Sequence, residues 1–152
     1  MRGKGFTFKQ FHIDHSRCAM KVGTDGTLIG AWFSTPCANA NILDVGTGTG
    51  LIAIMAAQRF STAQIIGIDI DSDCISQAEE NVAASPWSDR IEVVNKPLQE
   101  FSSSEGFDAI VSNPPYFVAH RKKSLTVCLF TSASFCVRMR IIVIKLGDFF
   151  EF

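Results

Sequence analysis

Several features are scarce or missing in this chain of 152 residues, and each absence excludes a class of protein. The five cysteines form no C-x-x-C pair, which argues against a disulfide framework or a zinc site and favours reduced thiols in the cytosol. The net charge of −1 gives no global nucleic-acid signature. No apolar run reaches transmembrane length, and the first residues lack the apolar core of a signal peptide. We therefore expect a cytoplasmic protein with no membrane partner and no metal; the sequence leaves the oligomeric state open, and a monomer is assumed.

The feature that is present, and that organises the chain, is a glycine-rich stretch from Ile42 to Gly50. A short apolar run ends in Asp44, and glycines follow at positions 46, 48 and 50, before an apolar helical pattern begins at Leu51. This order predicts a strand, a tight loop and a helix. The glycines allow positive φ and close approach of the backbone to a ligand. We interpret the loop as a cofactor site, with an ordinary glycine-rich turn as the alternative.

The glycine loop fits two cofactors. Gly48-x-Gly50-x-x-Ala53 satisfies the G-x-G-x-x-G/A dinucleotide pattern, and Asp69 follows at about the expected spacing of ~20 residues. The run Asp44-x-Gly46-x-Gly48-x-Gly50 instead resembles the first motif of class I methyltransferases, which bind S-adenosylmethionine (SAM). A carboxylate near the cationic groups of SAM is electrostatically favourable. Both interpretations place Asp69 on ribose hydroxyls, so the loop alone leaves NAD and SAM open.

The rest of the chain alternates between strand-like and helix-like segments. We expect strands at 5–11, 41–45, 64–70, 91–94 and 107–112, and helices at about 24–32, 51–60 and 72–82. Thr24 or Asp25 is the expected cap of the first helix, and Asp71 or Ser72 that of the third. In the third helix, Gln77, Glu79 and Glu80 are expected to face water. The alternation predicts an α/β fold with a doubly wound sheet, whose ligands bind at the carboxyl ends of the strands.

A second motif, Asn113-Pro114-Pro115-Tyr116, directly follows the strand predicted at 107–112. A rigid Pro-Pro turn is the structural alternative, but NAD enzymes have no need for this tetrapeptide. The lone pair of an exocyclic adenine nitrogen is delocalised and is a poor nucleophile. The Asn113 side-chain oxygen and the Pro114 carbonyl can each accept one N–H bond and aim the lone pair at a methyl group. Tyr116 offers a flat face for stacking an extruded base. The tetrapeptide therefore favours SAM and N-methylation.

At this point the chain resembles a family: the bacterial tRNA adenine-N6-methyltransferases that modify the adenine just 3′ of the anticodon in valine tRNA. The matching stretches are 5–11, 18–32, the glycine loop, 81–91 and 107–116. The resemblance implies a Rossmann-like class I fold, SAM as methyl donor and tRNA as partner. It also implies cofactor contacts at Asp44, Gly46, Gly48, Gly50 and Asp69, and substrate contacts at Asn113 and Tyr116. By resemblance only, Lys21, Thr24 and Asp25 close the pocket.

Other functions remain open from the sequence. A protein-glutamine N5-methyltransferase shares the N-P-P-Y motif, because an amide nitrogen poses the same chemical problem. An rRNA guanine-N2-methyltransferase is a further enzymatic alternative. A non-enzymatic alternative is an inert SAM-binding fragment.

Two departures from the family pattern set further expectations. Lys96-Pro97-Leu98 occupies the place where many class I enzymes carry an Asp for the cofactor adenine, so Leu98 packing and backbone groups are expected to hold that ring. After Phe117 the resemblance stops, and residues 118–152 carry six basic against two acidic side chains, a net +4. We therefore divide the chain into an N-terminal extension (1–40), a SAM-binding core (41–117) and an atypical tail (118–152). The fold is then expected to be incomplete at its C-terminus, through truncation or a frameshift, with marginal stability and weak or absent catalysis; a genuine basic RNA-binding tail is the alternative. Residues 140–145 are expected to form one strand that covers the exposed sheet edge.

Overall fold

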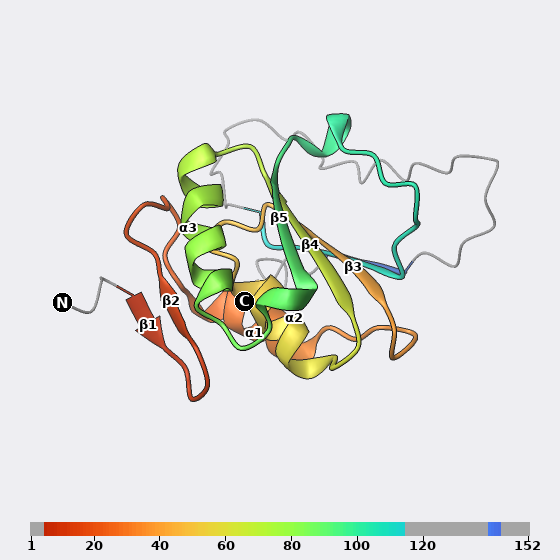
Figure 1. Ribbon diagram of the computed structural model, residues 1–152, viewed down its shortest axis with the longest axis horizontal. Coiled ribbons are helices and arrows are strands. Elements are labelled where there is room, and N and C mark those ends of the chain that lie inside the picture. Colours follow the sequence, from red (N-terminus) through yellow and green to blue (C-terminus); the bar gives the residue numbers. More distant parts are fainter. Residues whose placement is uncertain (1–4, 115–139, 144–152) are drawn as a thin grey trace, which may run out of the picture.

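The computed structural model describes residues 5–114 and 140–143 (Figure 1). A five-stranded parallel sheet forms its centre, built from β3 (Asn41–Val45), β4 (Gln64–Asp69), β5 (Ile91–Asn95), β6 (Ala109–Ser112) and β7 (Arg140–Val143). The strands lie in the order β5-β4-β3-β6-β7. The chain runs outward from β3 to β5 and then returns to the other side of β3. This reversal confirms the predicted doubly wound arrangement, in which ligands bind outside the carboxyl ends of the strands at the switch point, here beside the neighbouring strands β3 and β6.

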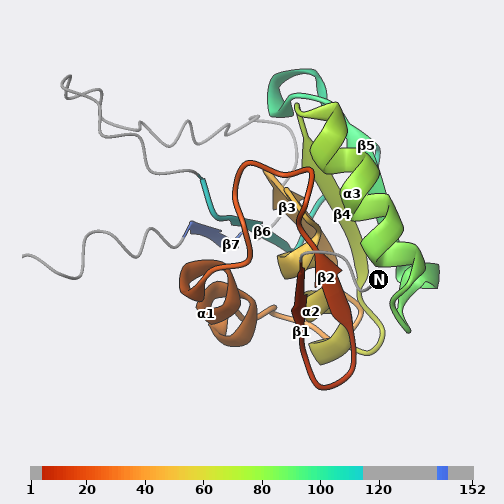
Figure 2. The same ribbon diagram turned by 90° about the vertical axis from the view of Figure 1, so that its left-hand side faces the viewer.

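Within the described residues, the sheet is accompanied by three α-helices: α1 (Thr24–Trp32), α2 (Leu51–Arg59) and α3 (Ser72–Ala83). Right-handed crossovers place α2 and α3 on the same face of the sheet, and α1 packs against α2 (Figures 1 and 2). Seven of the nine residues of α2 are buried, as its apolar sequence predicts. The main hydrophobic core therefore lies between this helical layer and the strands, with Ile42, Ile54 and Ile65 among its fully buried side chains.

Helix α3 confirms one prediction and corrects another. The Asp71 side chain caps the helix by accepting hydrogen bonds from the backbone N–H groups of Asp73 and Cys74. Gln77, however, does not face water, because its side chain is only 1 % exposed. It is covered by the segment that follows the N-terminal hairpin, a contact that no pattern within the helix encodes. Glu79 and Glu80 are exposed, as expected.

The N-terminal segment differs from the single half-buried strand predicted at 5–11. It forms an antiparallel hairpin of β1 (Gly5–Thr7) and β2 (His12–Asp14), in which all three residues of β1 are exposed. Phe8 and Phe11 stack in the turn at a centroid distance of 4.5 Å, and Phe11 meets Trp87 edge-on. The aromatic side chains in the alternating pattern thus belong to the turn, and the buried strand residue is Ile13. Two short 3-10 helices, Ser88–Arg90 and Leu98–Glu100, flank β5.

The outer edge of β6 is covered. β7 pairs with it in parallel, from Ala109 opposite Arg140 to Ser112 opposite Val143, so the predicted edge strand is confirmed. The other expectations for residues 118–152, including the proposed domain boundary, lie outside the described residues. Among the described residues, no helix is long and apolar enough to span a membrane.

Candidate functional site

The glycine loop between β3 and α2 has a shape that requires its glycines. Gly46, Gly48 and Gly50 have φ values of 71°, 55° and 78°, in the left-handed region that side chains with a Cβ avoid. The loop crosses the end of β4, where the N–H groups of Gly46 and Thr47 both donate to the carbonyl of Ile68, at 2.9 and 3.0 Å. The backbone of the loop is therefore tied to the neighbouring strand before any ligand is considered.

Most of the loop's N–H groups are already used inside the protein. Besides the two bonds to Ile68, the Gly48 N–H donates to Asp69 Oδ2 at 2.9 Å and the Gly50 N–H donates to the carbonyl of Thr47 at 2.9 Å. A ligand rich in phosphate oxygens would need such donors to be free. The loop instead presents a smooth backbone surface without side chains at its glycine positions.

Asp44 lies behind the loop and not among the residues that line the cleft described below. Its side chain is 1 % exposed, and Oδ2 accepts a hydrogen bond from Thr47 Oγ1 at 2.7 Å. Oδ1 is buried without a hydrogen-bond partner in the described part of the chain. Burial raises the pKa of Asp44 to about 7, against the opposing effect of the Thr47 hydroxyl. The Asp44 carboxylate thus forms its hydrogen bond with a residue of the glycine loop and does not line the cleft.

Asp69 stands at the carboxyl end of β4, as predicted, and its carboxylate faces the loop. Oδ2 accepts from Gly48 and Oδ1 accepts from the N–H of Asp71 at 3.0 Å. The carbonyl of Asp69 in turn accepts a bond from Asn95 Nδ2, at 2.9 Å, from the end of β5. Each carboxylate oxygen retains a further lone pair, so Asp69 can accept hydroxyl hydrogen bonds while holding the loop.

A cleft of about 820 Å³ opens at the carboxyl ends of β3, β4 and β6. Its size is ample for a cofactor of nucleoside dimensions. It brings together most of the predicted site residues, which come from distant parts of the chain: Lys21, Thr24, Asp25, Gly46, Gly48, Asp69, Leu98 and Asn113. Asp44, Gly50 and Pro114 do not line it, although all three adjoin lining residues in sequence.

Met20 and Ile70 are large, exposed apolar residues that line this cleft and are not among the predicted site residues. Ile70 was assigned to the end of a strand, but β4 ends at Asp69 and leaves the Ile70 side chain 76 % exposed. Leu98, which was predicted, is 47 % exposed at the same cleft. Ile70 and Leu98 are large, exposed apolar side chains that lie at the same cleft as the carboxylate of Asp69. Such side chains can pack against the face of an aromatic ring while the carboxylate binds a polar group attached to that ring. The sequence feature that could have predicted Ile70 as a cleft residue is its position directly after Asp69, at the end of a strand.

The cleft wall, which we define as residues 14–26, runs from the end of β2 into the first turn of α1. Lys21 holds this wall together, because its ammonium donates to the carbonyls of His15 and Cys18 at 2.8 and 3.0 Å. The helix cap is Gly23, which has no side chain to bond the first turn, so the prediction of Thr24 or Asp25 as the cap is wrong. Both residues lie inside the first turn and line the cleft, and the pocket-closing role that the resemblance implies stays a prediction.

Asn113 lines the cleft directly after β6, next to the α1 end of the cleft wall. The strand end is held by Ser112 Oγ, which donates to the carbonyl of Val45 at 2.8 Å. Asn113 Nδ2 lies 3.5 Å from the position that a Cβ on Gly26 would take, so the carboxamide approaches the first turn of α1 closely. Pro114 is half-buried beside it. Tyr116 lies outside the described residues.

The two N-terminal histidines are used structurally. The ring Nδ1 of His12 is 2.8 Å from Thr7 Oγ1 across the hairpin, and His15 Nδ1 accepts from the N–H of Val22 at 3.1 Å. Within the described residues, no group of three or more His, Cys, Asp or Glu side chains is placed to hold a metal ion.

Comparison with known proteins identifies relatives of this arrangement. The family model described as "Methyltransferase small domain" matches residues 18–139. The chain is 55% identical over 120 residues to the tRNA1(Val) (adenine(37)-N6)-methyltransferase of Aeromonas hydrophila, which covers 78% of this chain and 50% of the relative. It is 61% identical over 112 residues to the protein of the same name from Phocaeicola vulgatus, covering 74% of this chain and 47% of the relative. The chain thus spans about half the length of these relatives.

Proposed function

We propose an activity for this chain from one premise: it belongs to the methyltransferase small domain family. We propose that the chain carries the cofactor site and the substrate-nitrogen site of an enzyme that methylates N6 of an adenine in tRNA, with SAM as donor. The names of its relatives support adenine 37 of valine tRNA as the target. The observation that carries the proposal is the position of Asn113, which shares one cleft with Gly46, Gly48 and Asp69.

The residues of the cleft fit SAM better than NAD. Four of the five backbone N–H groups of the loop donate within the protein: those of Gly46, Thr47, Gly48 and Gly50. Few N–H donors therefore remain for the oxygens of a pyrophosphate. The exposed side chains of Ile70 and Leu98 offer apolar contact for an adenine ring without the acidic residue found in many class I enzymes. Asp69 would accept hydrogen bonds from the ribose hydroxyls. When bound, SAM supplies an electrophilic methyl group on a sulfonium.

The proposed role of Asn113 follows from the electronic structure of the substrate nitrogen. The Asn113 side-chain oxygen and the Pro114 carbonyl would each accept one N6–H hydrogen bond, turning the lone pair out of conjugation with the ring. The same two oxygens would stabilise the positive charge that develops on N6 as the nitrogen is methylated. The alkylated nitrogen then releases a proton to water, so no strong base is required. Tyr116 remains the proposed stacking partner of the base.

The setting of the reaction belongs to the same proposal. tRNA is the proposed partner, and the cytoplasm is the proposed location. Methylation of a glutamine amide or of guanine N2 uses similar acceptors, but the names of the relatives favour adenine.

The proposal is tested by methyl transfer from labelled SAM. The purified chain is given a valine tRNA transcript, the same transcript with guanine in place of adenine 37, or release-factor protein. We expect label in the first substrate alone. Asn113→Ala should lower the rate by about 10²–10³-fold, the cost of removing one transition-state hydrogen-bonding group, and leave S-adenosylhomocysteine affinity nearly unchanged. Asn39→Ala, at an exposed asparagine before β3, is the matched control. Label in the protein substrate alone would exclude the tRNA activity.

A further inference from the structure

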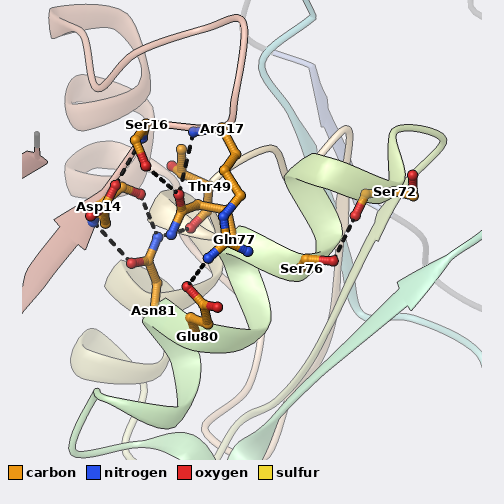
Figure 3. A network of polar contacts seen from close by, with 9 residues as sticks. All are labelled: Asp14, Ser16, Arg17, Thr49, Ser72, Ser76, Gln77, Glu80 and Asn81. Atoms are coloured by element: carbon orange, nitrogen blue, oxygen red, sulfur yellow. Dashed lines mark hydrogen bonds and ion pairs between the residues drawn. The ribbon is translucent and has the colours of Figure 1, made fainter. Parts of the chain in front are cut away.

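The carboxamide of Asn81, on α3, joins two segments that lie far apart in the sequence (Figure 3). Its Nδ2 donates to the carbonyl of Asp14 at 2.8 Å and to the carbonyl of Thr49 at 2.9 Å. Its Oδ1 accepts from the N–H of Asp14 at 2.9 Å. The side chain is only 4 % exposed, so water does not compete for these bonds. Asn81 therefore uses both amide hydrogens and its oxygen on backbone groups.

This bonding pattern is specific to a carboxamide of this length. The Asn81 carboxamide bonds both the backbone N–H and the backbone carbonyl of Asp14, as a neighbouring strand would, and its second amide hydrogen is donated to the carbonyl of Thr49. An aspartate in its place could accept from the Asp14 N–H but would face two carbonyl oxygens with a negative charge. A buried, fully bonded polar side chain is costly to disturb, because the groups it serves lose their partners with it.

The two bonded segments are the two sides of the cleft. Asp14 begins the cleft wall, residues 14–26, which goes on to include Lys21, Thr24 and Asp25. Thr49 belongs to the glycine loop and lines the cleft from the other side. Asn81 itself does not line the cleft, so it fixes the spacing between the two sides without a direct contact of its own.

Two other residues of α3 reach the cleft wall but not the glycine loop. Gln77 Oε1 accepts from Ser16 Oγ at 3.2 Å and from the N–H of Arg17 at 3.4 Å. Glu80 forms an exposed ion pair with Arg17. Figure 3 shows these contacts beside that of Asn81. They provide an internal comparison, because losing them would loosen the wall alone.

We propose that Asn81 is a positioning residue that couples the order of the cleft wall to the order of the glycine loop. The cofactor then binds a cleft whose two sides are held at a fixed spacing. Because such coupling is reciprocal, cofactor binding also makes the cleft wall more ordered. The identity of that cofactor rests on the function proposed above, whereas the coupling between wall and loop does not.

Amide hydrogen exchange on the full chain without ligand tests the coupling directly. Asn81→Ser, a neutral and shorter side chain, should speed exchange both in the wall and at residues 46–50, while peptides of β3 and β4 stay protected. Gln77→Met, a variant of similar size, should speed exchange in the wall only. Asn81→Asp should show the Asn81→Ser pattern more strongly. Faster exchange confined to the wall in both Asn81 variants, or spread evenly over the sheet, would overturn the proposal.

Calorimetry with S-adenosylhomocysteine provides the second measurement. At a temperature where each variant is fully folded, Asn81→Ser should weaken binding by at least about tenfold, the equivalent of one or two lost hydrogen bonds, and Gln77→Met by clearly less. Saturating ligand should restore wall protection in Asn81→Ser. Unchanged affinity in Asn81→Ser would overturn the link to the cofactor. If the wild-type chain binds no S-adenosylhomocysteine, the proposed function fails, and the exchange pattern still decides whether Asn81 couples wall and loop.

Discussion

The carboxylate of Asp69 accepts a hydrogen bond from the backbone N–H of Gly48 at 2.9 Å, which joins the end of β4 to the middle of the glycine loop. A residue that sequence patterns assign to a ligand thus also shapes the backbone beside that ligand. Removing it should therefore affect both stability and binding, and the two effects can be measured separately.

The first prediction concerns Asp69. Asp69→Ala should weaken S-adenosylhomocysteine binding by about 1–3 kcal/mol in calorimetry, because hydrogen bonds to a charged acceptor are lost and the loop is no longer held. Asp73→Ala, at an exposed carboxylate in the first turn of α3, is the control and should bind normally. Equal affinity of Asp69→Ala and the wild type would remove Asp69 from the site.

The second prediction concerns the backbone of the loop. Gly48 has a φ of 55°, so Gly48→Ala should lower the free energy of unfolding by about 1–2 kcal/mol through left-handed strain. Gly48→Asn is the comparison and should lose less stability, because asparagine enters the left-handed region more readily than alanine and a Cβ at this position would meet its nearest neighbour only at 4.0 Å. Urea denaturation measures both variants. Equal losses in the two would show that backbone conformation is not the cause.

The third prediction is a pH dependence from Asp44. Because burial raises the pKa of Asp44 from 3.8 to about 7, the folded protein keeps a proton that the unfolded chain releases. Between these two values the contribution of this group to the free energy of unfolding falls as pH rises, by at most about 1.4 kcal/mol per pH unit. Asp44→Asn has no such proton, so its stability should decline less across this range.

Denaturation of the wild type and Asp44→Asn at a series of pH values measures this difference. Asp73→Asn serves as the control for a general effect of removing a carboxylate. Parallel pH profiles for the wild type and Asp44→Asn would mean that Asp44 is not the titrating group.

The fourth prediction concerns Arg90, whose guanidinium caps the end of α2. Nη1 donates to the carbonyls of Phe60 and Ala63, and Nη2 to that of Ala57 at 2.7 Å. Arg90→Lys should lower the free energy of unfolding by about 1–3 kcal/mol, because an ammonium cannot reproduce this planar set of donors. Arg17→Lys, at an exposed ion pair, should change stability little. Similar losses in both variants would contradict the capping role.

Local sequence determined much of this fold. β3 spans Asn41–Val45 as predicted, because a short apolar run followed by alternating glycines permits few other conformations. The Asp71 cap was also predictable, since a side-chain oxygen there reaches N–H groups two and three residues away. Asp69 and Asn113 could be placed at the cleft from the strand pattern, because both stand at strand ends and parallel strands bring their carboxyl ends to one edge, whereas Lys21, Thr24 and Asp25 were predicted by resemblance alone.

Only the tertiary structure decided the partners of the polar side chains. Gln77 fits the water-facing stripe of an amphipathic helix, yet it is buried because Ser16 and Arg17 fold over it. Ile70 looked like a strand residue and became an exposed surface of the cleft, because β4 stops one residue earlier. Periodicity encodes which face of an element is apolar, but a polar group is buried or exposed according to whether a distant backbone satisfies its hydrogen bonds. Asn81 depends on two such backbones at once, and so its place beside the cleft is a property of the folded chain alone.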